Sequence, residues 1–309
     1  MEMKQLEIFT CVAKNLSFSK AAEEMYISQP SVSSHISSLE KNLGTQLLIR
    51  NTKGVSLTKA GQDFLVYAQK ILALREQALY DISGSNQSIS GIIDIIASTI
   101  PVQHLLPEII SSFQKKWPNI VFSVEQVSSC GVKQAMNGFR YDFGMVGTIF
   151  DDDDRFNRRL IYDDELVLIY PNDTKQKSEL IHKDFAKFLL SVPFIMRETG
   201  SGTRAEIEIL LSKIGVELCD LRIPAYFPDT HSILLAVSHG MGVSLISKIA
   251  AEMYVDAGLV KMACMDSPLF RRQIYLLHSK ALWLSPVQQA FADHAERYYC
   301  STKAPGAKF

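Results

Sequence analysis

The stretch from residue 17 to 61, SFSKAAEEMYISQPSVSSHISSLEKNLGTQLLIRNTKGVSLTKAG, constrains the fold more than any other part of the chain. Its pattern predicts two short helices joined by a tight turn and followed by a small wing. The second helix is expected to begin at Ser28, a favourable N-cap, with Pro30 in its first turn, where a missing N–H costs nothing. Its apolar residues recur at helical spacing and should face inward: Val32, Ile36, Leu39 and Leu43.

The opposite face of this second helix is short and polar. Such a face can lie in a major groove against base edges, and Gln29, Ser31 and Ser33 are the predicted base contacts. Arg50 and Lys53 lie in or beside the wing, where a cation suits phosphates. The full set predicted to contact DNA is Ser19, Gln29, Pro30, Ser31, Ser33, Ser34, Ser37, Arg50 and Lys53. The pattern alone fits an ordinary helical hairpin with a solvated serine-rich face equally well.

A resemblance decides between these two interpretations. The segments that carry it, in order, are Phe18-Ser19, Ala21-Ala22, Ser28-Gln29-Pro30-Ser31-Val32-Ser33, Leu39-Glu40, Leu43-Gly44, 47–50 and Leu57-Thr58-x-Ala60-Gly61. Together they resemble the winged helix-turn-helix of LysR-type transcriptional regulators. The chain departs from the family at Ser34 and Ser37, where many members carry Arg or Lys. Residues 1–62 hold seven Lys and Arg against five Asp and Glu, a net charge of +2, which is a weak electrostatic footprint for DNA.

Composition excludes several other classes of protein. The five cysteines are widely spaced and the seven histidines lack metal-ligand spacing, so neither a disulfide framework nor a metal site is expected. The start, MEMKQLEIF, has no signal-peptide core, and no apolar run approaches membrane length. We therefore expect a cytoplasmic protein with no membrane contact, no cofactor and no catalytic residue.

Residues 57–82 are predicted to form one long helix. Leu57, Phe64, Ile71 and Ala78 recur every seven residues, with a second apolar position between them, which is the stripe of a coiled coil. An amphipathic helix packed on its own domain is the alternative. The family resemblance also implies a dimerising linker helix, so residues 57–90 are predicted to be that helix and a hinge, SGSNQSISG at 83–91, with a homodimer and then a homotetramer as the assembly.

Beyond the hinge, short apolar runs alternate with helical patterns, which favours α/β units and a mostly parallel sheet. The resemblance implies a two-lobed effector domain, 91–300, like that of periplasmic binding proteins. One lobe is expected at 91–162 plus 268–300 and the other at 163–267. Small ligands are expected in the cleft between them, near strand ends and helix starts.

The sharpest candidate for ligand binding is the turn 199–203, TGSGT, between an apolar strand and a predicted helix. Free N–H groups at a helix start attract anions, and glycines let a ligand approach the backbone. Arg197 can add charge. The simpler alternative is an ordinary N-cap with a flexible turn. The string GSGTRA also fits a dinucleotide fingerprint, G-x-G-x-x-A, which raises a nucleotide-dependent enzyme as a rival function. The GSGTR string instead resembles one branch of LysR-type regulators, which includes some tied to sulfur or selenium metabolism.

Hydroxyl-bearing turns at other strand ends should face this turn across the cleft. In the family, hydroxyl residues at such turns often touch the effector, although Ile100 replaces a common Thr and Gly147 replaces a frequent acidic residue. The predicted effector site comprises Ser98, Thr99, Ile100, Ser129, Cys130, Thr148, Thr199, Gly200, Ser201, Gly202, Thr203 and Thr230. The favoured function is a promoter-binding regulator that responds to a small anionic metabolite. The rivals are the nucleotide-dependent enzyme and a ligand-free DNA-organising protein.

Overall fold

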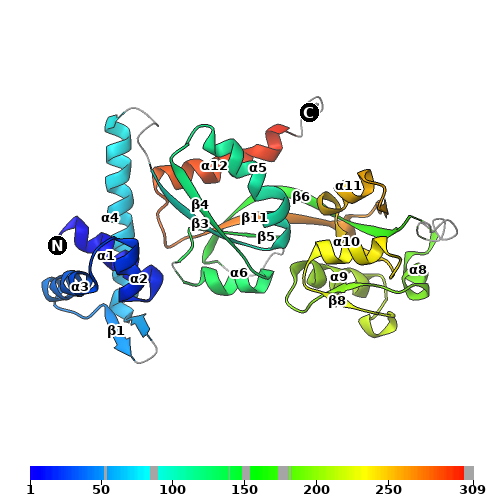
Figure 1. Cartoon of the computed structure of the whole chain (residues 1–309), viewed down its shortest axis with the longest axis horizontal. Helices are drawn as coiled ribbons and strands as arrows, with labels where there is room; N and C mark the ends of the chain where they lie inside the picture. The colour runs from blue at the N-terminus through cyan, green and yellow to red at the C-terminus, as the bar shows by residue number, and fades with distance from the viewer. Residues whose placement is uncertain are drawn as a thin grey trace.

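A computed structural model describes residues 1–51, 54–83, 90–138, 140–147, 154–172, 181 and 183–302. Its N-terminal unit comprises α1 (Met3–Asn15), α2 (Phe18–Glu24), α3 (Gln29–Leu43) and an antiparallel wing of β1 (Leu48–Asn51) and β2 (Gly54–Leu57) (Figure 1). Ser28 caps α3 by accepting a hydrogen bond from the backbone N–H of Ser31, and Gly44 ends the helix at φ 67°. The predicted winged helix-turn-helix is confirmed, apart from Leu43, which is 38% exposed because it lies in the last turn, beyond the domain core.

Helix α4 (Lys59–Ser83) stands beside this unit as a long, straight rod (Figure 1). It begins two residues later than predicted, because Leu57 belongs to the wing strand and the Thr58 hydroxyl accepts a hydrogen bond from Gly61 N at 2.9 Å. Gly61 is required there, since a Cβ would lie 2.0 Å from the carbonyl oxygen of Leu47.

The predicted apolar stripe on α4 is divided between two faces. Phe64 and Ile71 pack into the core of the N-terminal unit, whereas Tyr67, Leu74 and Ile82 are 63%, 60% and 85% exposed. A helix that packed only on its own domain would not carry such large exposed apolar side chains along the other face. The predicted hinge lies mostly outside the described residues, which resume at Ser90.

A seven-stranded sheet with the strand order β10-β6-β11-β5-β3-β4 forms the centre of the described C-terminal region, and β9 also pairs with β6. Strands β3 (Gly91–Ala97), β4 (Ile120–Gln126) and β5 (Phe143–Val146) are parallel. The long strand β6 (Phe156–Pro171) and strand β11 (Arg271–Ser279) are antiparallel to each other, and β9 (Ser244–Ser247) and β10 (Val260–Ala263) are antiparallel to β6. The predicted mostly parallel sheet is therefore wrong for this sheet, in which only β3 pairs in parallel with its two neighbours.

In the first lobe, helices cover both faces of the sheet. The turn η2 (Pro101–Leu105), α5 (Leu106–Gln114) and α12 (Pro286–Thr302) cover one face, and α6 (Ser129–Met136) covers the other (Figure 1). Successive side chains of β3 point to opposite faces of the sheet. Ile93 and Ile95 therefore pack in the core under α5 and α12, whereas Ile96 packs in the core under α6.

The second lobe is joined to the first by β6 and β11, which run from one lobe into the other (Figure 1). Its elements include α8 (Phe185–Ser191), β7 (Met196–Arg197), α9 (Gly202–Lys213), β8 (Tyr226–Phe227), α10 (Thr230–Ser238) and α11 (Lys248–Asp256), with short turns η3 (Leu218–Asp220) and η4 (Pro268–Phe270). The predicted lobe boundary at 162–163 falls inside β6, so the crossing is a continuous strand. Within the part of the chain described, no helix is long and apolar enough to cross a membrane.

Candidate effector cleft and DNA interface

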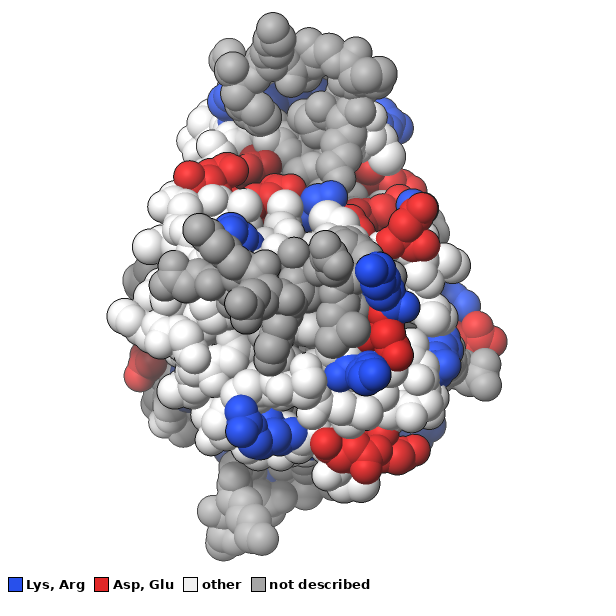
Figure 2. Space-filling view, turned by 90° about the vertical axis from the view of Figure 1, so that its right-hand side faces the viewer, with Lys and Arg blue, Asp and Glu red and all other residues white. Residues whose placement is uncertain are grey.

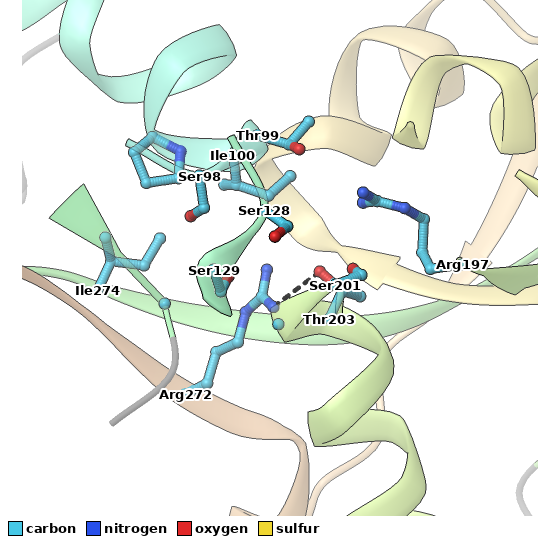
Figure 3. A pocket seen from close by; sticks show the side chains of 13 residues that line it. Ser98, Thr99, Ile100, Ser128, Ser129, Arg197, Ser201, Thr203, Arg272 and Ile274 are labelled. Atoms are coloured by element: carbon cyan, nitrogen blue, oxygen red, sulfur yellow. Dashed lines mark hydrogen bonds between the residues drawn. The ribbon is translucent and has the colours of Figure 1, made fainter. Parts of the chain in front are cut away.

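A small cavity of about 20 Å³ lies between the two lobes, and polar side chains from both surround it (Figure 3). The first lobe contributes the carboxyl end of β3 and the start of α6. The second lobe contributes the end of β7 and the start of α9, and β11 crosses beneath. The lining residues are Ser98, Thr99, Ile100, Pro101, Ser128, Ser129, Gly147, Arg197, Ser201, Gly202, Thr203, Arg272 and Ile274.

Two helix starts face each other across this cavity. Ser128 caps α6 by accepting from Gly131 N at 3.2 Å, and Ser201 caps α9 by accepting from Arg204 N at 3.5 Å. Gly200, at φ 91°, brings the α9 turn so close that a Cβ there would lie 3.8 Å from the Ser128 hydroxyl. Helix N-termini carry free N–H groups and a partial positive charge, so the cavity lies in a region that favours anions.

Arg197 projects into the cavity region from the end of β7 (Figure 3). It is only 4% exposed, and its guanidinium donates to the Thr230 hydroxyl at 3.3 Å and to the Pro228 carbonyl oxygen at 2.8 Å. Its Nε is buried without a hydrogen-bond partner. Burial lowers the pKa of Arg197, although the charges of Glu198 and Asp229 act in the opposite direction. A buried cation without an ion-pair partner is stabilised by an anion bound beside it.

Arg272 supplies a second guanidinium from β11. Its Nε donates to the Asp164 carboxylate at 2.7 Å and its terminal nitrogen donates to the Thr203 hydroxyl at 3.1 Å (Figure 3). Asp164 is 2% exposed and also accepts a hydrogen bond from Ser247 at 2.8 Å. The positive charge of Arg272 is therefore balanced within the protein, whereas none of the ion pairs found in the described chain involves Arg197.

The surface of the N-terminal unit that is predicted to contact DNA is separate from this cleft. Gln29, Ser34 and Ser37 are exposed along α3. The guanidinium of Arg50, from the wing, donates to the Ser33 hydroxyl at 2.9 Å and lies 4.0 Å above the ring of Phe18. The wing thus places the positive charge of Arg50 against the serine-rich face of α3, which carries no Lys or Arg of its own. At the far end of the second lobe, by contrast, the described basic and acidic side chains are intermixed (Figure 2).

Comparisons with known proteins agree with this division into two functional regions. A family model described as "Bacterial regulatory helix-turn-helix protein, lysR family" matches residues 3–62, and one described as "LysR substrate binding domain" matches residues 86–299. An uncharacterized HTH-type transcriptional regulator from Methanocaldococcus jannaschii is 34% identical over 281 residues, which cover 90% of this chain and 93% of that protein.

This chain belongs to the LysR family of transcriptional regulators. A probable RuBisCO transcriptional regulator from Cyanidium caldarium is 28% identical over 292 residues, covering 94% of this chain and 91% of that protein. Among solved structures, a full-length OxyR variant from Pseudomonas aeruginosa has a TM-score of 0.68 at 17% identity, covering 96% of this chain and 98% of the other. Full-length BenM has a TM-score of 0.60 at 21% identity, covering 99% and 100%. These structures share the fold.

The family assignment settles the rival functions. LysR-family members are DNA-binding transcriptional regulators with a domain for small effectors, and they are not enzymes. The nucleotide-dependent enzyme is therefore not supported. A ligand-free DNA-organising protein does not fit either, because the C-terminal match is to a substrate-binding domain.

In the structure of this LysR-family regulator, part of the predicted effector site lies together around the cavity. Seven of the predicted residues line the cavity: Ser98, Thr99, Ile100, Ser129, Ser201, Gly202 and Thr203. Gly200 lies beside Ser128, and Thr230 lies behind Arg197 as its hydrogen-bond partner. Cys130 and Thr199 are exposed and do not line the cavity. Thr148 lies outside the described residues.

Sequence reasoning missed Ser128, Arg272 and Ile274 as lining residues. Arg272 carried a usable signal, since a cation beside the apolar run QIYLLH is expected to be buried and therefore paired. In the DNA-binding unit, Ser19 and Pro30 are exposed as expected, Ser31 and Ser33 are half-buried, and Lys53 lies outside the described residues. Within the described chain, no cluster of three or more His, Cys, Asp or Glu side chains could hold a metal ion.

Proposed function

We propose that this regulator is controlled by a small anion bound between Thr99, Ser129, Arg197 and the 199–203 turn. The observation that carries the proposal is the buried Arg197, which lines a cavity flanked by two helix starts and forms none of the ion pairs found in the described chain. Charge-assisted hydrogen bonds to an anion are stronger than neutral ones, and the N–H groups at the helix starts add further donors.

The size of the cavity favours a compact ligand. A free volume of about 20 Å³ holds about one water molecule, so a nucleotide, which needs a longer groove, does not fit, and a compact anion enters when the lining side chains shift outward. The structure of the effector-binding domain of QuiR in complex with shikimate, a carboxylate, has a TM-score of 0.59 at 22% identity. The GSGTR string at 200–204 favours the branch tied to sulfur or selenium metabolism, so a tetrahedral oxyanion such as sulfate or selenate is our first choice of effector class.

The DNA contacts proposed for the regulator are those of α3 and the wing. Gln29, Ser31 and Ser33 are proposed to meet base edges, with Ser19, Pro30, Ser34 and Ser37 beside them and Arg50 and Lys53 at phosphates. Two contacts support this grouping: the Ser19 hydroxyl donates to the Gln29 side-chain oxygen at 3.5 Å, and the Arg50 guanidinium donates to the Ser33 hydroxyl at 2.9 Å. We place this activity in the cytoplasm.

The assembly proposed is a homodimer through α4, and then a homotetramer. Tyr67, Leu74, Leu79 and Ile82 leave a long apolar face of α4 in solvent within one chain. Burial of such a face against its copy is the ordinary way to remove it from water. A dimer also doubles the DNA contacts, which compensates for the weak net charge of the N-terminal unit.

Isothermal calorimetry with sulfate, selenate, small carboxylates and a neutral polyol tests the effector class. Binding of at least one anion is expected, and Arg197→Ala should weaken it about 10- to 100-fold because a charge-assisted hydrogen bond is lost from a buried site. The matched control is Arg159→Ala, because Arg159 on β6 pairs with Asp293 and Glu296 and lies outside the cavity lining. Binding of only the neutral compound, or equal loss in both variants, would contradict the proposal.

A further inference from the structure

One ion pair joins the DNA-binding unit to the effector domain. The ammonium of Lys14, in the last turn of α1, donates to the carboxylate of Asp94 on β3. The two residues are 80 positions apart, and their side chains are only 32% and 14% exposed. This contact is therefore partly shielded from water, where an ion pair is stronger than on an open surface.

Asp94 is held in place by a second carboxylate. The backbone N–H of Asp94 donates to the Asp142 carboxylate at 2.8 Å, and Asp142 N donates back to the Asp94 carbonyl oxygen at 2.9 Å. Gln288, in the first turn of α12, donates to the other oxygen of Asp142 at 2.8 Å. Burial raises the pKa of Asp142 to about 6, and the charge of Asp94 adds to this whereas Lys14 opposes it. Burial alone lowers the pKa of Lys14, but Asp94, Asp142 and Glu24 together raise it.

The rest of the joint combines a cavity with direct contacts between α4 and α12. A cavity of about 630 Å³ separates α4 from β3 and from the start of α12, and its lining includes Leu72, Glu76 and Trp283. On the other side, α1 is fixed to α4 by core packing and by an ion pair from Arg75 to Glu7 at 2.9 Å. The DNA-binding unit and α4 thus move together, and the Lys14 contact adds an ion pair to the contacts that α4 makes with α12 across the joint.

The two carboxylates also lie on strands that lead to the effector cleft. Asp94 is four residues before Ser98 on β3, and Asp142 directly precedes β5, which ends next to Gly147. The strands pair in parallel, with Ile96 opposite Gly144. Each therefore has one end at the cleft and the other at the Lys14 contact, a span of about 13 Å for four residues of extended chain.

We propose that Lys14 and the Asp94–Asp142 pair form an interdomain latch, which fixes the orientation of the DNA-binding unit relative to the first lobe and responds to the effector cleft through β3 and β5. The latch itself does not depend on the effector class. Its response to the cleft rests on the proposed function, and the two parts are tested separately.

Lysine acylation followed by mass spectrometry tests the latch in the full-length protein. With acetyl-N-hydroxysuccinimide, Lys14 should react about tenfold more slowly than the exposed Lys20 and Lys41, because the contact must open before the amine reacts. Asp94→Asn should remove that protection and leave Lys20 unchanged. Equal rates for Lys14 and Lys20 in the wild type, or continued protection in Asp94→Asn, would overturn the latch.

Small-angle X-ray scattering separates an orienting role from a merely local one. Lys14→Met should broaden the distance distribution of the full-length protein, whereas Lys4→Met should not, since Lys4 pairs with Glu7 within α1. The reversed pair, Lys14→Glu with Asp94→Lys, should narrow the distribution again. An unchanged distance distribution in Lys14→Met refutes the orienting role. A reversed-pair variant that unfolds at the wild-type temperature but keeps the broad distribution also refutes it.

Sulfate is the probe for the response to the cleft. Sulfate bound at the carboxyl ends of β3 and β5 should stiffen both strands and slow Lys14 acylation further, by about fivefold, relative to chloride at the same ionic strength. Arg197→Ala should abolish this effect. If calorimetry detects no binding of sulfate or of any other anion tested, the proposed anion site fails while the latch stands on the first experiment. If sulfate binds and Lys14 acylation does not slow, the coupling is refuted.

Discussion

Replacing Asp164 with Asn tests how the cleft balances its charges. Asp164 is 2% exposed, accepts from Arg272 at 2.7 Å and from Ser247 at 2.8 Å, and thereby joins β6, β11 and β9. Asn keeps the size and one acceptor oxygen but removes the negative charge. Arg272, itself 7% exposed, is then left as an uncompensated buried cation.

The expected cost is about 3 kcal/mol in the free energy of unfolding. Breaking a buried ion pair by removing one partner costs about 3–5 kcal/mol, and the lower end applies because Asn still accepts one hydrogen bond. Urea unfolding followed by tryptophan fluorescence measures it, since Trp117 and Trp283 both lie in the effector domain. Asp164→Leu combined with Arg272→Met removes both charges and should be close to neutral.

Sulfate should partly reverse the destabilisation. The Arg272 charge freed in Asp164→Asn strengthens anion binding, and a ligand that binds only the folded state raises its stability by mass action. The gap between Asp164→Asn and the wild type should therefore narrow as sulfate is added, whereas the double variant, which keeps Arg197, should gain no more stability from sulfate than the wild type does. Unfolding of Asp164→Asn at the wild-type urea concentration, with or without sulfate, would refute the argument.

Three further predictions concern the other parts of the molecule. Leu74→Glu places a charge on the exposed apolar face of α4, so sedimentation should show dissociation to monomers; an unchanged distribution would mean that α4 pairs by another face. Asp142→Asn should change how stability depends on pH. Burial raises the pKa of Asp142 from 3.8 to about 6, so the folded wild type binds this proton more tightly than the unfolded chain and loses stability as pH rises through that window. The variant should lack this loss when thermal unfolding is measured as a function of pH. Arg50→Ala should weaken binding to a selected DNA duplex in gel-shift titration by more than Ser33→Ala, which as a single base contact should cost about 1–3 kcal/mol; equal affinity for all three proteins would remove both residues from the DNA interface.

Local signals in the sequence were sufficient for the DNA-binding unit. Its helix starts at Ser17 and Ser28 and its helix end at Gly44 depend on caps that act within three or four residues. The same holds for the strand ends and the α9 turn, whose hydroxyl groups were expected at the cleft before any tertiary contact was known. Features encoded within one turn of helix or one strand end can be predicted because their energies depend on neighbours in the chain.

Only the tertiary structure decided the contacts between distant segments. Arg272 and Asp164 are 108 positions apart, and Lys14 and Asp94 are 80 apart, so neither pair has a signature in local sequence. The apolar stripe on α4 was visible, but its division between the domain core and the exposed face was not, because periodicity does not say which surface a helix meets. The antiparallel course of β6 and β11 was likewise hidden, since an apolar run has the same pattern in either direction. The charge balance in the cleft, and the split of the apolar residues of α4 between the domain core and solvent, depend on which surfaces meet. Which surfaces meet depends on the packing of the whole chain.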